Sequence, residues 1–140
     1  MVKGFGRSID YLETRPEIDR DKIAYFGFSW GGYYGPIIAA IETRIKVCVF
    51  LVGGIAAEKA LPEADAINFA PRVKVPVLML NGRYDFYCPV QSCQLALFRL
   101  LGTPEENKRH MLFEGSHNIP RTELIKETLN WFDRYLGPVK

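Results

Sequence analysis

Ser29, Asp85 and His117 carry the side chains needed for nucleophilic attack on a carbonyl group. A serine hydroxyl becomes nucleophilic when a histidine removes its proton, and a carboxylate can hold that histidine in the required tautomer. The three residues follow one another in the chain as serine, aspartate and histidine. That order separates one group of folds with such a triad from the others. We therefore predict that the folded chain brings these three side chains together.

The serine lies in the sequence Gly27-Phe28-Ser29-Trp30-Gly31, a G-x-S-x-G pattern. Glycines two residues before and two residues after the serine remove the Cβ clashes that a sharp turn would create. Five residues with three fixed letters recur by chance, so the flanking sequence matters. The apolar run Ile23–Phe26 precedes the pattern, and small residues typical of a closely packed helix follow it. The alternative is a turn serine that only begins a helix.

The acid and the histidine each have a competing interpretation. Asp85 could instead be a turn or helix-capping aspartate. Glu114 is the reserve acid, and the alternative for Glu114 is a solvent-facing side chain. His117 could be a surface-loop histidine. The only other histidine, His110, lies inside a predicted strand, where packing or hydrogen bonding is a more common role than catalysis.

Aromatic residues cluster in the sequence next to the serine and next to the aspartate. They could form a pocket for the acyl group, although the cores of α/β proteins use such residues as well. Our substrate-binding candidates from this set are Trp30, Tyr33, Tyr84, Phe86 and Tyr87, and Tyr34 lies beside them in the sequence.

Four short apolar runs are predicted to be the strands that position these residues. Each run is continuous rather than alternating, which is typical of parallel strands that are buried on both faces. The candidate residues follow the first, third and fourth runs, and the carboxyl ends of parallel strands are where functional residues gather. The predicted strands are Lys22–Phe28, Lys46–Val52, Val75–Asn81 and Arg109–Phe113.

Helical patterns separate the predicted strands, so the fold class is α/β with a parallel sheet. The chain fits a single domain over residues 1–140. The segment Glu58–Pro71 is less regular and is predicted to be a short helix and a loop that cover the site. The predicted helices are Ser8–Arg15, Tyr33–Thr43, Gln91–Leu101 and Thr122–Leu136.

Composition excludes several classes of partner. The chain is 48% hydrophobic and has a net charge of +2 with both signs interspersed, which favours a packed globular protein and argues against binding to nucleic acid or to a membrane. No signal-peptide pattern and no apolar run long enough to span a bilayer is present. We therefore expect a cytoplasmic protein.

The three cysteines form no recognisable framework. Cys48 lies in an apolar run and is predicted to be a small core residue. Cys88 and Cys93 could be near neighbours, but their spacing matches no metal motif, and we expect them to be free thiols in a reducing compartment. No metal and no cofactor is expected.

Three segments together resemble the C-terminal part of an α/β-hydrolase of the prolyl-oligopeptidase or dienelactone-hydrolase-like kind. These segments are Gly27–Gly32, Pro76–Asp85 and Glu114–His117, which precedes the closing helix. The resemblance implies a truncated α/β-hydrolase fold with about four parallel strands and helices on both faces. It also implies that Ser29 is the nucleophile, that His117 is the base oriented by Asp85, and that the backbone N–H of Trp30 is one oxyanion donor.

The chain departs from this fold ahead of the serine. A full α/β-hydrolase places several strands there, and an early loop supplies a second oxyanion N–H that has no counterpart here. The strand Lys22–Phe28 would then leave one apolar edge unpaired, and such an edge invites pairing with another chain. We therefore expect a homodimer or higher homo-oligomer that covers this edge.

These observations favour a serine esterase that acts on small or aromatic carboxylic esters. Peptide hydrolysis is less favoured, because the related peptidases select peptides with an additional domain. The competing hypothesis is a vestigial or regulatory module that keeps the fold without competent catalysis. A third possibility is that the chain is the C-terminal segment of a longer hydrolase.

Overall fold

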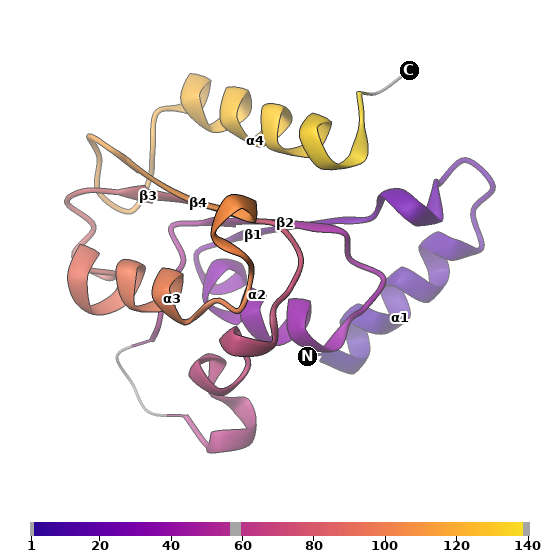
Figure 1. Ribbon diagram of the computed structural model, residues 1–140, viewed down its shortest axis with the longest axis horizontal. Coiled ribbons are helices and arrows are strands. Elements are labelled where there is room, and N and C mark those ends of the chain that lie inside the picture. The colour runs from indigo at the N-terminus through magenta and orange to yellow at the C-terminus, as the bar shows by residue number, and fades with distance from the viewer. Residues whose placement is uncertain (1, 57–59, 139–140) are drawn as a thin grey trace.

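A parallel sheet lies at the centre of the fold (Figure 1). The computed structural model describes residues 2–56 and 60–138. In this part of the chain the strands pair in the order β1-β2-β3-β4, and every pair is parallel. All residues of β2 and β3 are buried, and this burial explains why these strands are continuous apolar runs in the sequence. The strands are β1 (Ala24–Phe28), β2 (Val47–Leu51), β3 (Val77–Gly82) and β4 (Lys108–Phe113).

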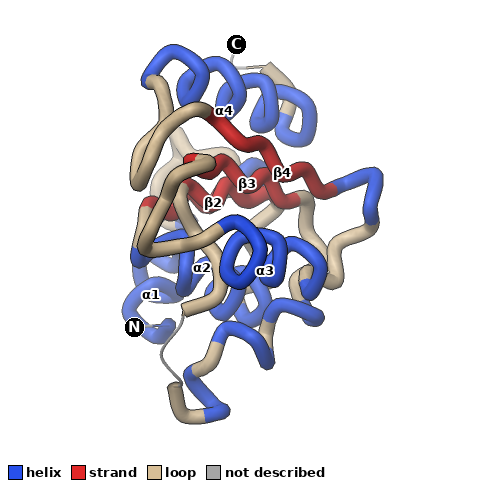
Figure 2. The backbone as a smooth tube through the Cα atoms, turned by 90° about the vertical axis from the view of Figure 1, so that its left-hand side faces the viewer, coloured by secondary structure: helices blue, strands red, loops and turns tan. Residues whose placement is uncertain are grey.

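Helices cover both faces of this sheet, so the predicted fold class is confirmed. The helices α1, α2 and α3 lie on one face, and α4 lies alone on the other (Figures 1 and 2). The last helix begins one residue before its predicted start. The bounds are α1 (Val2–Glu13), α2 (Trp30–Ile41), α3 (Leu95–Leu100) and α4 (Arg121–Leu136).

The other helix boundaries correct the prediction. The first helix starts at Val2 rather than Ser8. Its glycines weaken the helical pattern in the sequence, but Phe5 and Ile9 pack against the core and stabilise the helix. The second starts directly after Ser29. The predicted helix Gln91–Leu101 is divided into a π-turn at Val90–Gln94 and the short α3. In that turn the N–H groups of residues 93 and 94 both donate to the carbonyl of Pro89.

The irregular segment predicted at Glu58–Pro71 begins with residues 58 and 59, which lie outside the described residues. The rest consists of short 3-10 helices rather than one short helix. They span Pro62–Ala64, Ala66–Asn68 and Ala70–Arg72.

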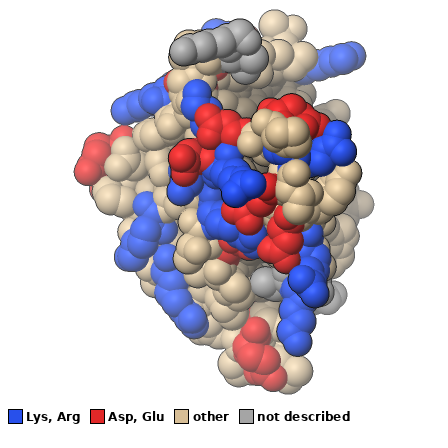
Figure 3. Space-filling view, turned by 90° about the vertical axis from the view of Figure 1, so that its right-hand side faces the viewer, with Lys and Arg blue, Asp and Glu red and all other residues tan. Residues whose placement is uncertain are grey.

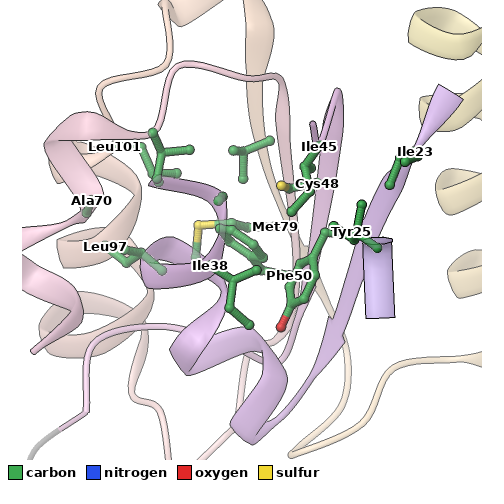
Figure 4. Packing of buried hydrophobic residues seen from close by; sticks show 14 residues of the cluster. Ile23, Tyr25, Ile38, Ile45, Cys48, Phe50, Ala70, Met79, Leu97 and Leu101 are labelled. Atoms are coloured by element: carbon green, nitrogen blue, oxygen red, sulfur yellow. The ribbon is translucent and has the colours of Figure 1, made fainter. Parts of the chain in front are cut away.

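The core has two layers because successive strand side chains point to opposite faces. On the side of α1 to α3, the ring of Phe50 lies among side chains from the strands and helices (Figure 4). Tyr25 meets this ring edge-on, with the centroids 6.2 Å apart. On the other side, Val49 and Leu78 pack in a cluster with Trp131 of α4. The sheet is therefore fixed from both sides, and its carboxyl ends are held in register.

The edge strand β1 exposes apolar side chains beside α4. Phe26 and Phe28 remain 44% and 54% exposed, and Ile125 and Leu129 of α4 are also exposed. A groove of about 250 Å³ runs between Phe26 and the helix. This arrangement matches the apolar edge that was expected at the first strand.

Charged side chains are mixed on the surface. On the face shown in Figure 3, acidic and basic side chains lie side by side. Arg44 forms ion pairs with Asp10 and Glu13 of α1 and with Glu42, and it thereby ties α1 to the loop that leads into β2. Among the described helices, none is long and apolar enough to cross a membrane.

Candidate active site

Ser29 occupies a strained turn between β1 and α2. Its φ of 51° and ψ of −110° place a non-glycine residue in a sparsely populated region, and such outliers persist only where the surrounding structure fixes them. The Ser29 N–H donates to the carbonyl of Leu51 at 2.9 Å. A Cβ at Gly27 would collide with the Gly31 backbone, whereas one at Gly31 would meet only the Tyr25 hydroxyl at 3.5 Å. The clash argument therefore holds for Gly27 and is wrong for Gly31.

The structure brings Ser29, His117 and Asp85 together in one chain of hydrogen bonds. Ser29 Oγ lies 2.7 Å from Nε2 of His117, and Nδ1 of the same ring lies 2.8 Å from Oδ2 of Asp85. With the ring hydrogen on Nδ1, that nitrogen donates to the carboxylate and Nε2 accepts from the serine hydroxyl. The three side chains follow the carboxyl ends of β1, β3 and β4. This geometry suits transfer of the serine proton to the imidazole.

Asp85 is fixed by its own loop. The residue is 3% exposed, and its Oδ1 accepts hydrogen bonds from the N–H groups of Tyr87 at 3.0 Å and Cys88 at 3.2 Å. The second oxygen, Oδ2, is left to face the histidine. A buried carboxylate needs such donors to offset the loss of solvation. The loop therefore both stabilises the charge and aims it.

Glu114, the reserve acid, and His110, the other histidine, make contacts outside this chain of hydrogen bonds. Glu114 is exposed and accepts a hydrogen bond from Nε of Arg83 at 3.0 Å. His110 lies in β4, and its ring is tilted against Phe98 with the centroids 5.9 Å apart. Burial lowers the pKa of His110 to about 4, so this ring is neutral at pH 7. The solvent-facing interpretation of Glu114 and the packing interpretation of His110 fit these contacts.

A cavity of about 830 Å³ opens beside Ser29 and His117. Of the predicted substrate-binding residues, Trp30, Tyr33 and Tyr87 line it, together with Tyr34. Trp30 and Tyr34 stack with their ring centroids 5.6 Å apart.

Two predicted substrate-binding residues, Tyr84 and Phe86, are absent from the cavity lining. They are 65% and 70% exposed, and the ring of Phe86 packs against that of Tyr87. A substrate-binding role for Tyr84 and Phe86 stays a prediction.

The opposite wall of the cavity comes mainly from residues 60–66, part of the segment predicted to cover the site, although none of these residues was named as a lining residue. It is formed by one carboxylate, Asp65, and by small residues with no chemical signature in the sequence. Oδ1 of Asp65 accepts from the N–H of Ile67 at 3.1 Å and caps the short helix that follows. The small residues in this wall are Ala56, Ala60, Ala64 and Ala66.

The loop after β2 was also missed. Val52 has a φ of 45°, which is an outlier for a β-branched residue. A Cβ at Gly32 would lie 2.8 Å from the Cα of Gly53, so these two glycines allow α2 to approach the loop closely. Strained or glycine-dependent backbone therefore lies at the ends of both β1 and β2.

The cysteine prediction was partly wrong. Cys48 is a buried free thiol in the core, as expected, and burial raises its pKa. Cys88 and Cys93 form a disulfide instead of remaining thiols. The turn that follows Asp85 brings their Cα atoms to 5.1 Å, a separation that suits a disulfide. The expected cytoplasmic location stays a prediction.

The start of α2 provides a backbone donor beside the serine. Trp30 is the first residue of this helix, so its N–H has no acceptor within the helix.

No group of three histidine, cysteine, aspartate or glutamate side chains that could hold a metal ion occurs within residues 2–56 and 60–138.

The geometry agrees with a family comparison. The model of the dienelactone hydrolase family matches residues 1–100, which include the serine turn, β3 and Asp85. This chain belongs to the dienelactone hydrolase family. The family match ends before His117.

Individual relatives are esterases and a peptidase. A cold-adapted esterase from an Arctic intertidal metagenomic library, in its zinc-bound structure, superposes with a TM-score of 0.81 at 27% identity, over 96% of this chain and 57% of that one. Acetyl esterase Axe7A of Xylanibacter ruminicola is 28% identical over 72% of this chain and 29% of its own length. The uncharacterized peptidase YuxL of Bacillus subtilis is 23% identical over 89% of this chain and 24% of its own length. The chain thus spans about half of the solved esterase and about a quarter of the curated relatives.

Proposed function

We propose that this chain is a serine hydrolase that cleaves carboxylic esters through an acyl-enzyme intermediate. The observation that carries the proposal is the hydrogen-bonded series Ser29–His117–Asp85, which ends at a strained serine turn. Membership of a hydrolase family and the similarity to esterases support it. The buried and hydrogen-bonded acid supports it further.

In the acylation step, Ser29 Oγ attacks the ester carbonyl carbon while Nε2 of His117 takes the hydroxyl proton. Asp85 stabilises the imidazolium that forms, and the Trp30 N–H donates to the developing oxyanion. The tetrahedral intermediate then collapses. The C–O bond to the alcohol breaks, and His117 returns the proton to the leaving oxygen.

In the deacylation step, a water molecule replaces the alcohol. His117 removes a proton from the water as it attacks the acyl carbon, and the same nitrogen then protonates Ser29 Oγ as the acyl bond breaks. The products are a carboxylic acid and the free serine. Every proton transfer in the cycle passes through Nε2 of His117, which lies 2.7 Å from Ser29 Oγ.

The cavity favours small acyl groups or flat aromatic groups. Trp30, Tyr33 and Tyr87 present ring surfaces to it, and alanines form the facing wall. Aromatic pairs gain most when the rings are offset or edge-to-face, so an aryl ester has surfaces to pack against. The size of about 830 Å³ leaves room for both halves of a small ester.

The competing proposal is a hydrolase-fold module with little or no turnover. The observation that favours it is that Trp30 is the one oxyanion donor that we assign in the described residues. Losing a single donor of this type costs about 3–4 kcal/mol, or roughly a hundred- to a thousand-fold in rate. Under this proposal the serine turn is intact and the chemical step is slow.

Hydrolysis of p-nitrophenyl acetate separates the two proposals. The esterase proposal predicts turnover by the wild type and its loss in Ser29→Ala. Ser8→Ala is the matched control, because Ser8 is an exposed serine on α1. Equal rates in wild type and Ser29→Ala would contradict the esterase proposal, and a wild-type rate at the level of buffer would favour the module.

We also propose that a second copy of the chain covers the edge of β1. The exposed Phe26 and Phe28 and the apolar groove beside α4 support this homodimer. Light scattering at micromolar concentration should give a dimer mass, and Phe26→Lys should give a monomer. Tyr11→Lys on exposed α1 is the control and should leave the dimer intact. A monomer for the wild type would overturn this proposal.

A further inference from the structure

The Cys88–Cys93 disulfide lies directly behind the acid of the candidate site. We propose that this disulfide is a positioning element for Asp85, and that its reduction lowers the turnover of the enzyme. The inference rests on the proposed esterase function and adds a group that acts on the chemistry through Asp85. The disulfide itself does not contact the reacting atoms.

The first link is between the disulfide and the carboxylate. The backbone N–H of Cys88 donates to Oδ1 of Asp85 at 3.2 Å, and the N–H of Tyr87 donates to the same oxygen at 3.0 Å. These two donors set the rotation of the carboxylate, and that rotation aims Oδ2 at His117. A cross-link at Cys88 therefore restrains one of the two donors directly.

The second link fixes the other end of the cross-link. The carbonyl of Cys93 accepts from the N–H of Ile55 at 3.2 Å. Cys88 Sγ lies 3.6 Å from the carbonyl oxygen of Gly53. A Cβ at Gly54 would collide with both sulfur atoms. The disulfide thus packs against the loop that follows β2, and it connects that loop to Asp85 through these contacts.

The third link leads to the cavity. Cys93 Sγ lies 3.8 Å from the hydroxyl of Tyr33, which donates to the carbonyl of Tyr87 at 3.3 Å. Tyr33 and Tyr87 both line the cavity. The cross-link is therefore shared between the acid and one wall of the substrate pocket.

Gln94 also holds the loop that carries Asp85, and its hydrogen bonds do not depend on the disulfide. Its Nε2 donates to the carbonyls of Gly82 at 2.9 Å and Cys88 at 2.7 Å. The side chain is fully buried. Because these hydrogen bonds remain, we expect reduction to loosen the loop without unfolding it, and to lower turnover in part.

The reaction is a thiol–disulfide exchange with a dithiol. The dithiol supplies two electrons and two protons, the Sγ–Sγ bond breaks, and two thiols and one cyclic disulfide of the reductant form. Cys88 and Cys93 are 0% and 4% exposed, so the exchange requires a local opening of the loop. A misplacement of a catalytic group by about 1 Å can cost on the order of a hundred-fold in rate.

The test compares oxidised protein, protein reduced with dithiothreitol, and the double variant Cys88→Ala/Cys93→Ala. Titration of thiols in the unfolded oxidised protein should find one thiol, from Cys48. With p-nitrophenyl acetate, kcat should fall by about ten- to a hundred-fold in the reduced protein and in the double variant. KM should stay within about two-fold, and reoxidation should restore kcat in the wild type but not in the double variant.

Cys48→Ala is the matched control, because Cys48 is a buried cysteine in the core outside this loop. It should lose activity on reduction and regain it on reoxidation as the wild type does. An unchanged kcat after complete reduction, or three thiols in the oxidised protein, would overturn the inference. A rise in KM at constant kcat would also overturn it, because that result would assign the disulfide to substrate binding.

Hydrogen exchange provides a readout that does not depend on turnover. The amide hydrogens of Tyr87 and Cys88 should exchange at least about ten-fold faster in the reduced protein, while those of β2 and β3 stay protected. Equal exchange in the two states would overturn the inference. If the oxidised wild type shows no turnover while these two amides respond to reduction, the esterase proposal fails and the link between the disulfide and Asp85 stands.

Discussion

The two sides of the candidate site are held in place very differently. The acid loop, residues 82–94, carries a disulfide, a buried glutamine with two hydrogen bonds and two N–H groups on the Asp85 carboxylate. The facing wall of the cavity comes mainly from residues 60–68, a segment of short 3-10 turns, with Asp65 capping one of them. Most residues of this wall are exposed.

This difference assigns the two sides to different tasks. A proton relay loses rate when its members shift by fractions of an ångström, so the relay needs a rigid frame. A wall of alanines on short turns can accept substitutions without disturbing that frame. We infer that the frame of the acid loop acts mainly on kcat and that the facing wall contributes to the selection of the ester.

The largest effect is expected at the relay itself. His117→Ala removes the proton acceptor of Ser29 and should lower kcat by about 10⁴-fold or more, with the fold unchanged by circular dichroism. His110→Gln, a change at the other histidine, should leave kcat within about two-fold. Similar rates for both variants would mean that His117 is not the base.

A smaller effect is expected from the frame of the acid loop. Gln94→Leu keeps a side chain of similar size and removes both donors, so the carbonyls of Gly82 and Cys88 lose a buried partner. We expect a loss of about 2 kcal/mol in the free energy of unfolding and a fall in kcat of roughly ten-fold. Urea unfolding and steady-state kinetics measure the two quantities. A rise in KM without a change in kcat would weaken the division between the two sides.

The facing wall should show the opposite pattern. Ala64→Leu adds bulk to the cavity and should raise KM for p-nitrophenyl benzoate by about five-fold, while kcat for p-nitrophenyl acetate stays the same. Leu61→Ala is a control in the same segment, because Leu61 is exposed and does not line the cavity. If Ala64→Leu lowers kcat for the acetate as well, this wall also takes part in positioning the relay.

The smallest effect concerns stability and should leave both sides of the site unchanged. Burial holds the pKa of His110 at about 4, below its usual value of 6.5. Between pH 6.5 and pH 4, His110 takes up a proton in the unfolded chain but not in the folded chain. The free energy of unfolding therefore falls as the pH decreases through this range. Because the ring is partly exposed, the loss between pH 7 and pH 5 should be on the order of 1 kcal/mol.

Removing the histidine tests this dependence. In His110→Gln, the loss of stability between pH 7 and pH 5 should be smaller than in the wild type by that amount. Urea titrations at the two pH values give the comparison. An identical pH dependence in the two proteins would show that His110 is not responsible.

The sequence was sufficient to predict that Ser29, Asp85 and His117 lie close together, for a physical reason. Parallel strands end at a common edge, so residues that directly follow such strands meet even when they are far apart in the chain. The continuous apolar runs identified these strands. The strained turn at Ser29 was expected from Gly27 and Gly31, although only Gly27 has no room for a Cβ. The fold class followed from the same alternation of strands and helices.

The parts that were missed depend on local backbone geometry or on residues without chemical identity. The disulfide depends on a turn that brings Cys88 and Cys93 together, and their spacing alone did not show it. An alanine wall has no signature in a sequence, because alanine is common in every kind of buried or exposed surface.

The most direct test of the proposed chemistry is covalent labelling of the serine. The wild-type protein should react with a fluorophosphonate, and peptide mass spectrometry should place one adduct on Ser29. Labelling should be lost in Ser29→Ala and strongly slowed in His117→Ala. An adduct at another residue, or equal labelling of the wild type and Ser29→Ala, would contradict the account of this site as a serine hydrolase.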